Sequence, residues 1–163
     1  MQPTPQPPVV PADSEIAAAL GRIPSGLFIV AWCDDGADRC MLASWVMQAG
    51  FAPPQVSVAI AESRDLLSAI DRGLPFVVSV LGDSQRGLLA RFGKAGPEPF
   101  AGLTVHRTAS GAAALPDAAA WMECRPTARA AHGDHVVVLA EVVTAGSGGG
   151  EPAVHVRRNG LRY

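Results

Sequence analysis

Short apolar runs separated by turn residues dominate the chain, and this pattern predicts a mainly β protein. The densest run covers residues 26–33 and predicts a buried strand, because it is rich in β-branched and aromatic side chains. Asp34, Asp35 and Gly36 favour a turn, after which a second strand over 40–48 would complete a hairpin. The same criteria predict further strands over 55–61, 75–81, 103–108, 119–129, 135–143 and 153–157.

Only short helices are expected between these strands. The first covers 16–20, with Asp13 or Ser14 as its N-cap, and the second covers 64–72, with Ser63 as its N-cap. A third follows Asp83 or Ser84 and places Leu88, Leu89 and Phe92 on one face. A Gly/Pro loop over 93–102 and a flexible connector over 146–150 complete the pattern. About seven strands without regular helical alternation favour an antiparallel barrel over a Rossmann sheet.

Composition places the chain among globular proteins of one domain. It has 163 residues, of which 48% are hydrophobic and 17% charged. The formal net charge of −2 argues against nonspecific nucleic-acid binding, which needs a basic surface. No apolar run is long enough to cross a bilayer, so we expect no membrane association. Five prolines and no charge in residues 1–11 predict a disordered arm over 1–12, followed by the domain over 13–163.

Cysteine usage and the N-terminal pattern favour the cytoplasm. The arm lacks the basic start and apolar stretch of a signal peptide. Three cysteines cannot all pair, which favours free thiols in a reducing compartment, with a Cys33–Cys40 bridge as the alternative. The chain has no CxxC, and its histidines stand at no zinc spacing, so we expect no metal site. Walker and Gly-x-Ser-x-Gly motifs are also absent.

Three segments could carry chemistry: Arg39–Gln48, Val58–Arg64 and Gly133-Asp134-His135. Their order and spacing, together with 19–28, 76–81, 89–93, 100–102 and 121–124, resemble the flavin reductase-like family. The resemblance covers residues 13–157. It implies an FMN-binding split β-barrel, mainly β and antiparallel, with a few short flanking helices.

In this family the strand that matches 41–46 lays its backbone along the flavin ring. The resemblance therefore implies a flavin-binding strand containing Met41, Leu42, Ala43, Ser44, Trp45 and Gln48. Backbone N–H and C=O groups suit the pyrimidine edge of the flavin, and small side chains at 43 and 44 permit close approach. From the residues alone, an ordinary half-buried strand remains the alternative.

The resemblance places the flavin phosphate at 59–64. The implied contacts there are Ala59, Ala61, the hydroxyl of Ser63 and the guanidinium of Arg64, beside the start of a helix. A plain helix cap with a solvated arginine is the alternative. Phe92 would cover part of the flavin, or it is simply a core aromatic residue.

The remaining candidates belong to the nicotinamide side of the site. By resemblance, Gly133 permits a turn, Asp134 orients the loop, and His135 seats the nicotinamide over the flavin. An ordinary hairpin turn with an exposed histidine is the alternative. His155 in the final predicted strand is a further candidate for ligand contact.

The function that these residues imply is an NAD(P)H-dependent flavin reductase. It would transfer hydride from NADH or NADPH to FMN or FAD, and the cofactor would supply the redox chemistry. The resemblance also implies a homodimer and a flavin-dependent monooxygenase as a possible partner. Two alternatives stay open: a flavoredoxin-like electron-transfer protein that retains FMN, and a split-barrel protein with other flavin-dependent chemistry.

Overall fold

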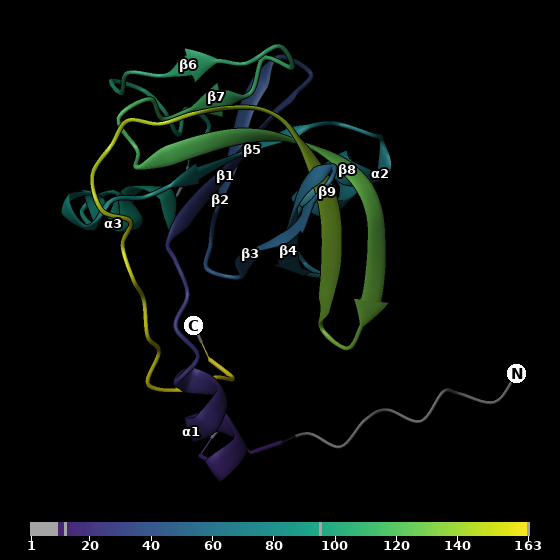
Figure 1. Ribbon diagram of the computed structural model, residues 1–163, viewed down its shortest axis with the longest axis vertical. Coiled ribbons are helices and arrows are strands. Elements are labelled where there is room, and N and C mark those ends of the chain that lie inside the picture. The colour runs from purple at the N-terminus through teal and green to yellow at the C-terminus, as the bar shows by residue number, and fades with distance from the viewer. Residues whose placement is uncertain (1–9, 12, 95, 163) are drawn as a thin grey trace, which may run out of the picture.

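A seven-stranded antiparallel sheet forms the body of the molecule in the computed structural model, which describes residues 10, 11, 13–94 and 96–162 (Figure 1). The strand order is β2-β1-β5-β8-β9-β4-β3. The strands are β1 (Phe28–Asp34), β2 (Ala37–Ala43), β3 (Val46–Phe51), β4 (Pro54–Ala61), β5 (Phe76–Val80), β8 (Ala120–His132) and β9 (His135–Gly146). A mainly β, antiparallel fold is confirmed.

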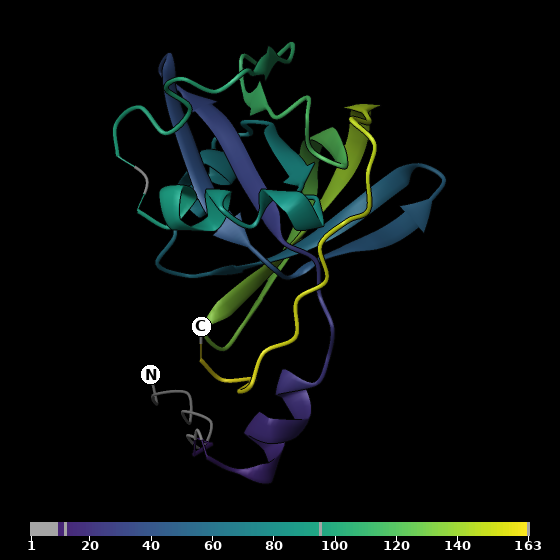
Figure 2. The same ribbon diagram turned by 90° about the vertical axis from the view of Figure 1, so that its left-hand side faces the viewer.

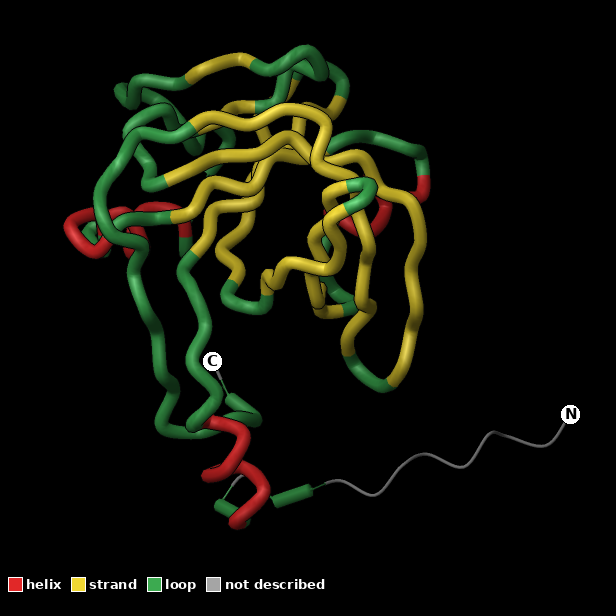
Figure 3. The backbone as a smooth tube through the Cα atoms, in the orientation of Figure 1, coloured by secondary structure: helices red, strands yellow, loops and turns green. Residues whose placement is uncertain are grey.

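The sheet curls because its two edge strands are consecutive in the chain. β2 and β3 lie at opposite ends of the strand order, yet only Ser44 and Trp45 connect them. Three Cα steps span at most about 11 Å, so the two edges must approach each other. Figure 3 shows the resulting barrel of strands, and the Ala59 N–H donates to the Trp45 carbonyl at 3.0 Å across the junction. The single strand predicted over 40–48 is therefore wrong.

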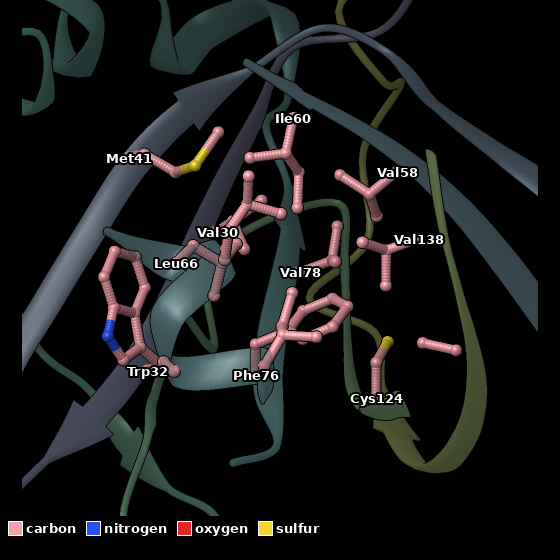
Figure 4. Packing of buried hydrophobic residues seen from close by; sticks show 14 of the residues in the cluster. Val30, Trp32, Met41, Val58, Ile60, Leu66, Phe76, Val78, Cys124 and Val138 are labelled. Carbon is pink, nitrogen blue, oxygen red and sulfur yellow. The ribbon is translucent and has the colours of Figure 1, made fainter. Parts of the chain in front are cut away.

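The barrel interior holds the main hydrophobic core. Alternate residues of the strands point inward, among them Val30, Val58, Phe76, Val78 and Val138 (Figure 4). These five residues are fully buried, and helix α2 (Leu66–Asp71) adds further apolar side chains to the same cluster. Burial of this kind stabilises the fold by roughly 25 cal/mol per Å² of apolar surface.

A second core lies on the outer face of β1. It contains Leu27, Ile29 and Ala31, and it is covered by helix α3 (Leu88–Phe92) and the segment 100–118. The short strands β6 (His106–Arg107) and β7 (Ala113–Ala114) pair with each other in that segment. The strand predicted over 103–108 is thus reduced to two residues, and β7 was not predicted.

The helices begin somewhat differently from the prediction. Ser14 caps α1 (Glu15–Gly21) by accepting a hydrogen bond from the Ala17 N–H, as expected. α2 has Asp65, not Ser63, at its N-cap position, and no side chain caps it. Asp83 and Ser84 form a separate 3₁₀ turn, η1 (Asp83–Gln85), so they do not cap α3.

The segment after β9 contains no regular strand. The strand predicted over 153–157 is wrong: the described residues of this segment form only the isolated bridges Ser25–His155 and Gly82–Pro152 in place of a ladder. The predicted connector also begins later, because Gly146 still belongs to β9. A strand requires a continuous ladder, and here only isolated residues reach a partner.

Helix α1 and residues 153–162, the C-terminal arm, extend beyond the barrel (Figures 1 and 2). The two segments run side by side in both views, and the Gly160 N–H donates to the Ala17 carbonyl at 2.7 Å. Most of the predicted N-terminal arm, 1–9 and residue 12, lies outside the described residues. Among the described helices, none is long and apolar enough to span a membrane.

A cationic cleft at the barrel seam

A cleft of about 850 Å³ opens where β2 ends and the chain turns into β3. Four structural parts form its walls: the end of β2 with the junction 44–45, the end of β4, the end of α3, and the C-terminal arm. This volume falls within the range of small-molecule sites, about 300–1,000 Å³. The lining residues are Leu27, 40–45, Ala59, Ala61, Arg64, Leu89, 92–94, 155–159 and Arg162.

The β2 side of the cleft combines small side chains with exposed backbone. β2 is an edge strand, so alternate residues direct their N–H and C=O groups away from β1. Ala43, Ser44, Ala59 and Ala61 leave room beside this backbone. A planar ligand with a hydrogen-bonding edge could therefore lie against the strand and meet donors and acceptors directly.

Five cations surround the cleft, and no carboxylate is found among its described lining residues. They are Arg64, Lys94, Arg157, Arg158 and Arg162. The chain has 13 lysines and arginines, so eight remain for the rest of a sequence with 15 acidic residues. A positively charged cleft in a protein of net negative charge attracts an anionic ligand to that one site.

Arg64 connects the cleft with a smaller pocket of about 120 Å³. That pocket is lined by Ser63, Arg64 and Asp65 at the start of α2, and by Trp32, Cys40 and Met41 from the barrel wall. Cys40, Met41 and Arg64 line both spaces, so the two adjoin. A hydroxyl and a guanidinium therefore lie next to each other at one end of the cleft, where they could hold a phosphate.

Trp45 occupies the junction between the cleft and the β8–β9 turn. Its ring lies 4.8 Å, centroid to centroid, from the ring of His135, and the Arg157 guanidinium carbon lies 4.8 Å from the Trp45 centroid. His135 Nδ1 is 2.9 Å from Asp134 Oδ1, and this hydrogen bond lowers the pKa of Asp134. His135 itself does not line the cleft; it contacts the indole that does.

The structure brings ten of the fifteen predicted site residues to the cleft wall. They are Met41, Leu42, Ala43, Ser44, Trp45, Ala59, Ala61, Arg64, Phe92 and His155. Ser63 lies in the adjoining pocket instead. Gly133 and Asp134 form the β8–β9 turn, where Gly133 has φ +72°, and the Asp134 carbonyl accepts from the Glu62 N–H at 3.0 Å. Gln48 is exposed on β3, away from the cleft lining.

The main residues that sequence reasoning missed belong to the C-terminal arm. Arg157, Arg158, Asn159 and Arg162 all line the cleft. A signal for them is present in the sequence, because three arginines follow the last acidic residue, Glu151, within eleven positions. Their distance along the chain from 39–64 concealed that they join the same site.

Cys40 lines the cleft but is not set up as a nucleophile. Burial, followed by the nearby charge of Asp38, raises its pKa to about 11. The thiolate is the reactive form, so Cys40 is held as a neutral thiol at neutral pH. Cys33, Cys40 and Cys124 are each unpaired in the structure. Cys40 therefore contributes to the cleft wall as a neutral side chain and not as an activated nucleophile.

A flavin mononucleotide fits these features. The ring requires a flat, partly apolar space with backbone hydrogen-bonding groups along one side, which the β2 edge supplies. Its phosphate requires donors and positive charge, which Ser63 and Arg64 supply at one end. Phe92 is 3% exposed, and its ring centroid lies 5.2 Å from that of Phe100, so it adds a rigid apolar surface to the cleft wall.

The fold and the cleft define a β-barrel domain able to bind a phosphorylated aromatic ligand. A family model described as the flavin reductase like domain matches residues 20–160, so the chain belongs to this family of flavin-associated oxidoreductase domains. The diflavin flavoprotein A 1 of Synechocystis sp. is 35% identical over 158 residues, which cover 93% of this chain and 27% of that relative. The chain thus spans about a quarter of the length of this curated relative.

Solved structures confirm the fold. The NADH:FAD oxidoreductase of Streptomyces globisporus superposes with a TM-score of 0.79 at 23% identity, covering 94% of this chain and 90% of that one. The styrene monooxygenase flavin reductase of Pseudomonas putida gives a TM-score of 0.74 at 23% identity, covering 88% and 93%. The split barrel predicted from the sequence is therefore confirmed.

Proposed function

We propose that this protein is a flavin reductase that uses NADH or NADPH to reduce bound FMN or FAD. The observation that carries the proposal is the cleft, which pairs an exposed strand edge with a ring of cations in a chain of the flavin reductase-like family. The neighbour from Streptomyces globisporus, which was also solved in complex with NAD and FAD fragments, supports this choice of ligands.

In this proposal the chain binds and orients, and the flavin supplies the redox chemistry. A bound flavin would supply that chemistry as the acceptor of a hydride, two electrons and a proton, which a reduced nicotinamide cofactor gives up as it is oxidised. The edge of β2 from Met41 to Ala43 holds the ring, while Ser63 and Arg64 hold the first phosphate. Rigid placement of the two rings lowers the barrier, because orientation is fixed before reaction.

His135 acts on the cleft as a positioning residue in this account. Its ring packs against Trp45, and Asp134 fixes the ring through Nδ1. Arg157 contacts the same indole. His135 would then set where Trp45 stands beside the nicotinamide, which preserves the role expected for Gly133-Asp134-His135 but makes it indirect.

The phosphate end of the cleft offers a direct test. In Arg64→Gln we expect the Kd for FMN to rise about tenfold or more, because a charged hydrogen bond to phosphate is lost. Riboflavin has the same ring without the phosphate, so its Kd is expected to change less than twofold. Fluorescence titration measures both. Arg125→Gln is the matched control, because Arg125 lies on β8 beside Glu141, outside the cleft lining. Equal losses for FMN and riboflavin would reject the assignment.

A second candidate function is electron transfer by a flavin that stays bound. It is favoured by the relative from Synechocystis sp., whose name describes a diflavin protein. The matched region makes up 27% of that relative. A domain of that kind could exchange electrons with a second flavin. Bound flavin that reduced nicotinamide cofactors do not bleach would favour this candidate.

We also propose a homodimer and a separate acceptor protein. Apolar side chains stand exposed on and after α1 and on the C-terminal arm: Ile16, Leu20, Ile23, Val154, Val156 and Leu161. Clustered exposed apolar groups favour contact with another surface, and a second copy would supply it. The name of the neighbour from Pseudomonas putida associates that reductase with a monooxygenase, which supports a flavin-dependent monooxygenase as acceptor.

A further inference from the structure

The cleft holds more positive charge than one flavin phosphate requires. In the proposed function, Arg64 and Ser63 at the start of α2 take that phosphate. Lys94, at the end of α3, and Arg157, Arg158 and Arg162, on the C-terminal arm, also line the cleft. No carboxylate is found among the described lining residues, so these cations are not neutralised by the cleft itself.

Three of these cations are available to an incoming anion. Lys94, Arg158 and Arg162 are exposed, and none forms an ion pair in the described part of the chain. Five arginines outside the cleft lining each form an ion pair with a carboxylate: Arg72, Arg86, Arg107, Arg125 and Arg129. Five of the eight cations outside the cleft lining thus have an acidic partner, whereas Lys94, Arg158 and Arg162 have none among the described residues and can meet a ligand.

The C-terminal arm is held in place, although it forms no strand. The Ser25 and His155 backbones exchange two hydrogen bonds, of 2.9 and 2.7 Å. The Arg86 guanidinium donates to the Val154 carbonyl at 2.7 Å. Farther along, Gly160 packs so closely on α1 that an added Cβ would lie 2.2 Å from the Leu20 Cβ. The arm arginines thus start from a fixed backbone, which reduces the entropy lost on binding.

We propose that the C-terminal arm binds the adenosine phosphates of the nicotinamide cofactor and selects NADPH over NADH. Arg158 and Arg162 are the specificity-determining residues, and Lys94, which follows α3, adds a third positive charge to the same cleft. The inference rests on the proposed reductase function, because it concerns the second ligand of the same cleft.

The charge of the 2′-phosphate is the reason for this preference. NADPH and NADH share the pyrophosphate, but NADPH adds a phosphate monoester that carries about −1.5 to −2 charges near pH 7. Arginine guanidinium groups bind such monoesters with two parallel hydrogen bonds. A group of unpaired arginines gains most from the more highly charged cofactor, and salt would weaken that gain.

The experiment compares Arg158→Gln/Arg162→Gln with the wild type in two measurements. Calorimetry gives the Kd of NADP⁺ and of NAD⁺, and steady-state assays with saturating FMN give kcat/KM for NADPH and NADH. We expect the wild type to favour the 2′-phosphorylated cofactor at least tenfold in both. The double variant should lose about ten- to a hundredfold with NADP⁺ and NADPH, and less than threefold with NAD⁺ and NADH. Arg125→Gln is the control and should match the wild type.

The other outcomes overturn either this inference or the proposed function on which it rests. A wild type that binds both cofactors equally, or prefers NADH, contradicts the selection. Equal losses for the two cofactors in the double variant would show that the arm contacts only their shared part. A wild type that binds NADP⁺ tightly but never reduces FMN would reject the proposed reductase function while leaving the arm assignment intact. Normal FMN reduction with no effect of the variant would reject the arm assignment alone.

Discussion

At the scale of single residues, Glu123 shows how the fold secures a buried charge. Its side chain is 4% exposed on β8, and the Ser110 N–H donates to its Oε1 at 3.1 Å. Burial alone would raise the pKa of this carboxyl group, but the hydrogen bonds from Ser110 and Thr108 outweigh burial and lower it. Glu123 thus anchors the loop between β6 and β7 to the barrel.

We predict an acid sensitivity that depends on this residue. Because the folded-state pKa of Glu123 lies below its ordinary value of 4.5, the ionised group stabilises the fold above that pH. That contribution is lost as the pH falls through the lowered pKa. Thermal unfolding between pH 7 and 3 should therefore show a shallower pH dependence of Tm in Glu123→Gln than in the wild type. At pH 7 the variant should lose about 1–3 kcal/mol of stability. Parallel Tm profiles would contradict the assignment.

His135 gives the second residue-scale prediction. If it positions Trp45 by ring contact, an aromatic replacement should preserve much of its effect. We expect His135→Ala to lower the rate of flavin reduction about tenfold, and His135→Phe to retain at least a third of the wild-type rate. Stopped-flow absorbance measures both rates, and the tryptophan fluorescence of the protein, to which Trp45 contributes, should shift only in the alanine variant. Equal loss in both variants would instead indicate direct contact between the imidazole and the nicotinamide.

At the scale of elements, the junction between β2 and β3 decides where the site forms. The apolar run 40–48 looks continuous in the sequence, and hydrophobic patterning cannot reveal that its two halves join opposite edges of the sheet. Closure of the barrel imposes the break at Ser44 and Trp45. The segments 26–33 and 75–81 were predictable because each is a dense, buried strand, and 55–61 because its residues alternate between the core and the other face of the sheet.

The C-terminal arm could not be predicted as an element. The sequence 153–157 resembles a short strand, but only His155 has a bridge partner there, Ser25. Its geometry comes instead from contact with α1, which lies more than 130 residues earlier in the chain. Local patterns carry no information about such a contact. The ends of β2, β4 and α3 were recognised as candidate ligand contacts from their own sequence segments. The arm arginines were missed because it is the contact with α1, distant in the sequence, that brings them to the cleft.

Gly160 provides the prediction at this scale. An added methyl group would lie 2.2 Å from the Leu20 Cβ and 2.7 Å from the Gly21 nitrogen, so Gly160→Ala must move the arm from α1. We expect the Kd for NADP⁺ to rise at least fivefold, because the arginines lose their fixed backbone, while the barrel Tm falls by less than about 5 °C. Gly87→Ala is the control, since a Cβ at Gly87 meets nothing within 4 Å. Calorimetry showing unchanged NADP⁺ affinity would separate the arm from ligand binding.

At the scale of the whole molecule, the distribution of charge links fold to function. The chain is net acidic, yet five of its basic residues gather at one cleft from parts of the sequence nearly a hundred residues apart. Only the closed barrel and the α1–arm contact bring them together. The formal net charge of −2 argues against a general affinity for polyanions, but it conceals this local group of cations.

The most direct test of the reductase proposal is an anaerobic titration of the purified protein with FMN and then with NADPH or NADH. The visible absorbance of the flavin reports both its binding and its reduction. We predict that FMN binds and that NADPH bleaches it, with one nicotinamide cofactor oxidised per flavin reduced. Failure of FMN and FAD to bind, or bound flavin that keeps its colour with both nicotinamide cofactors, would contradict the account.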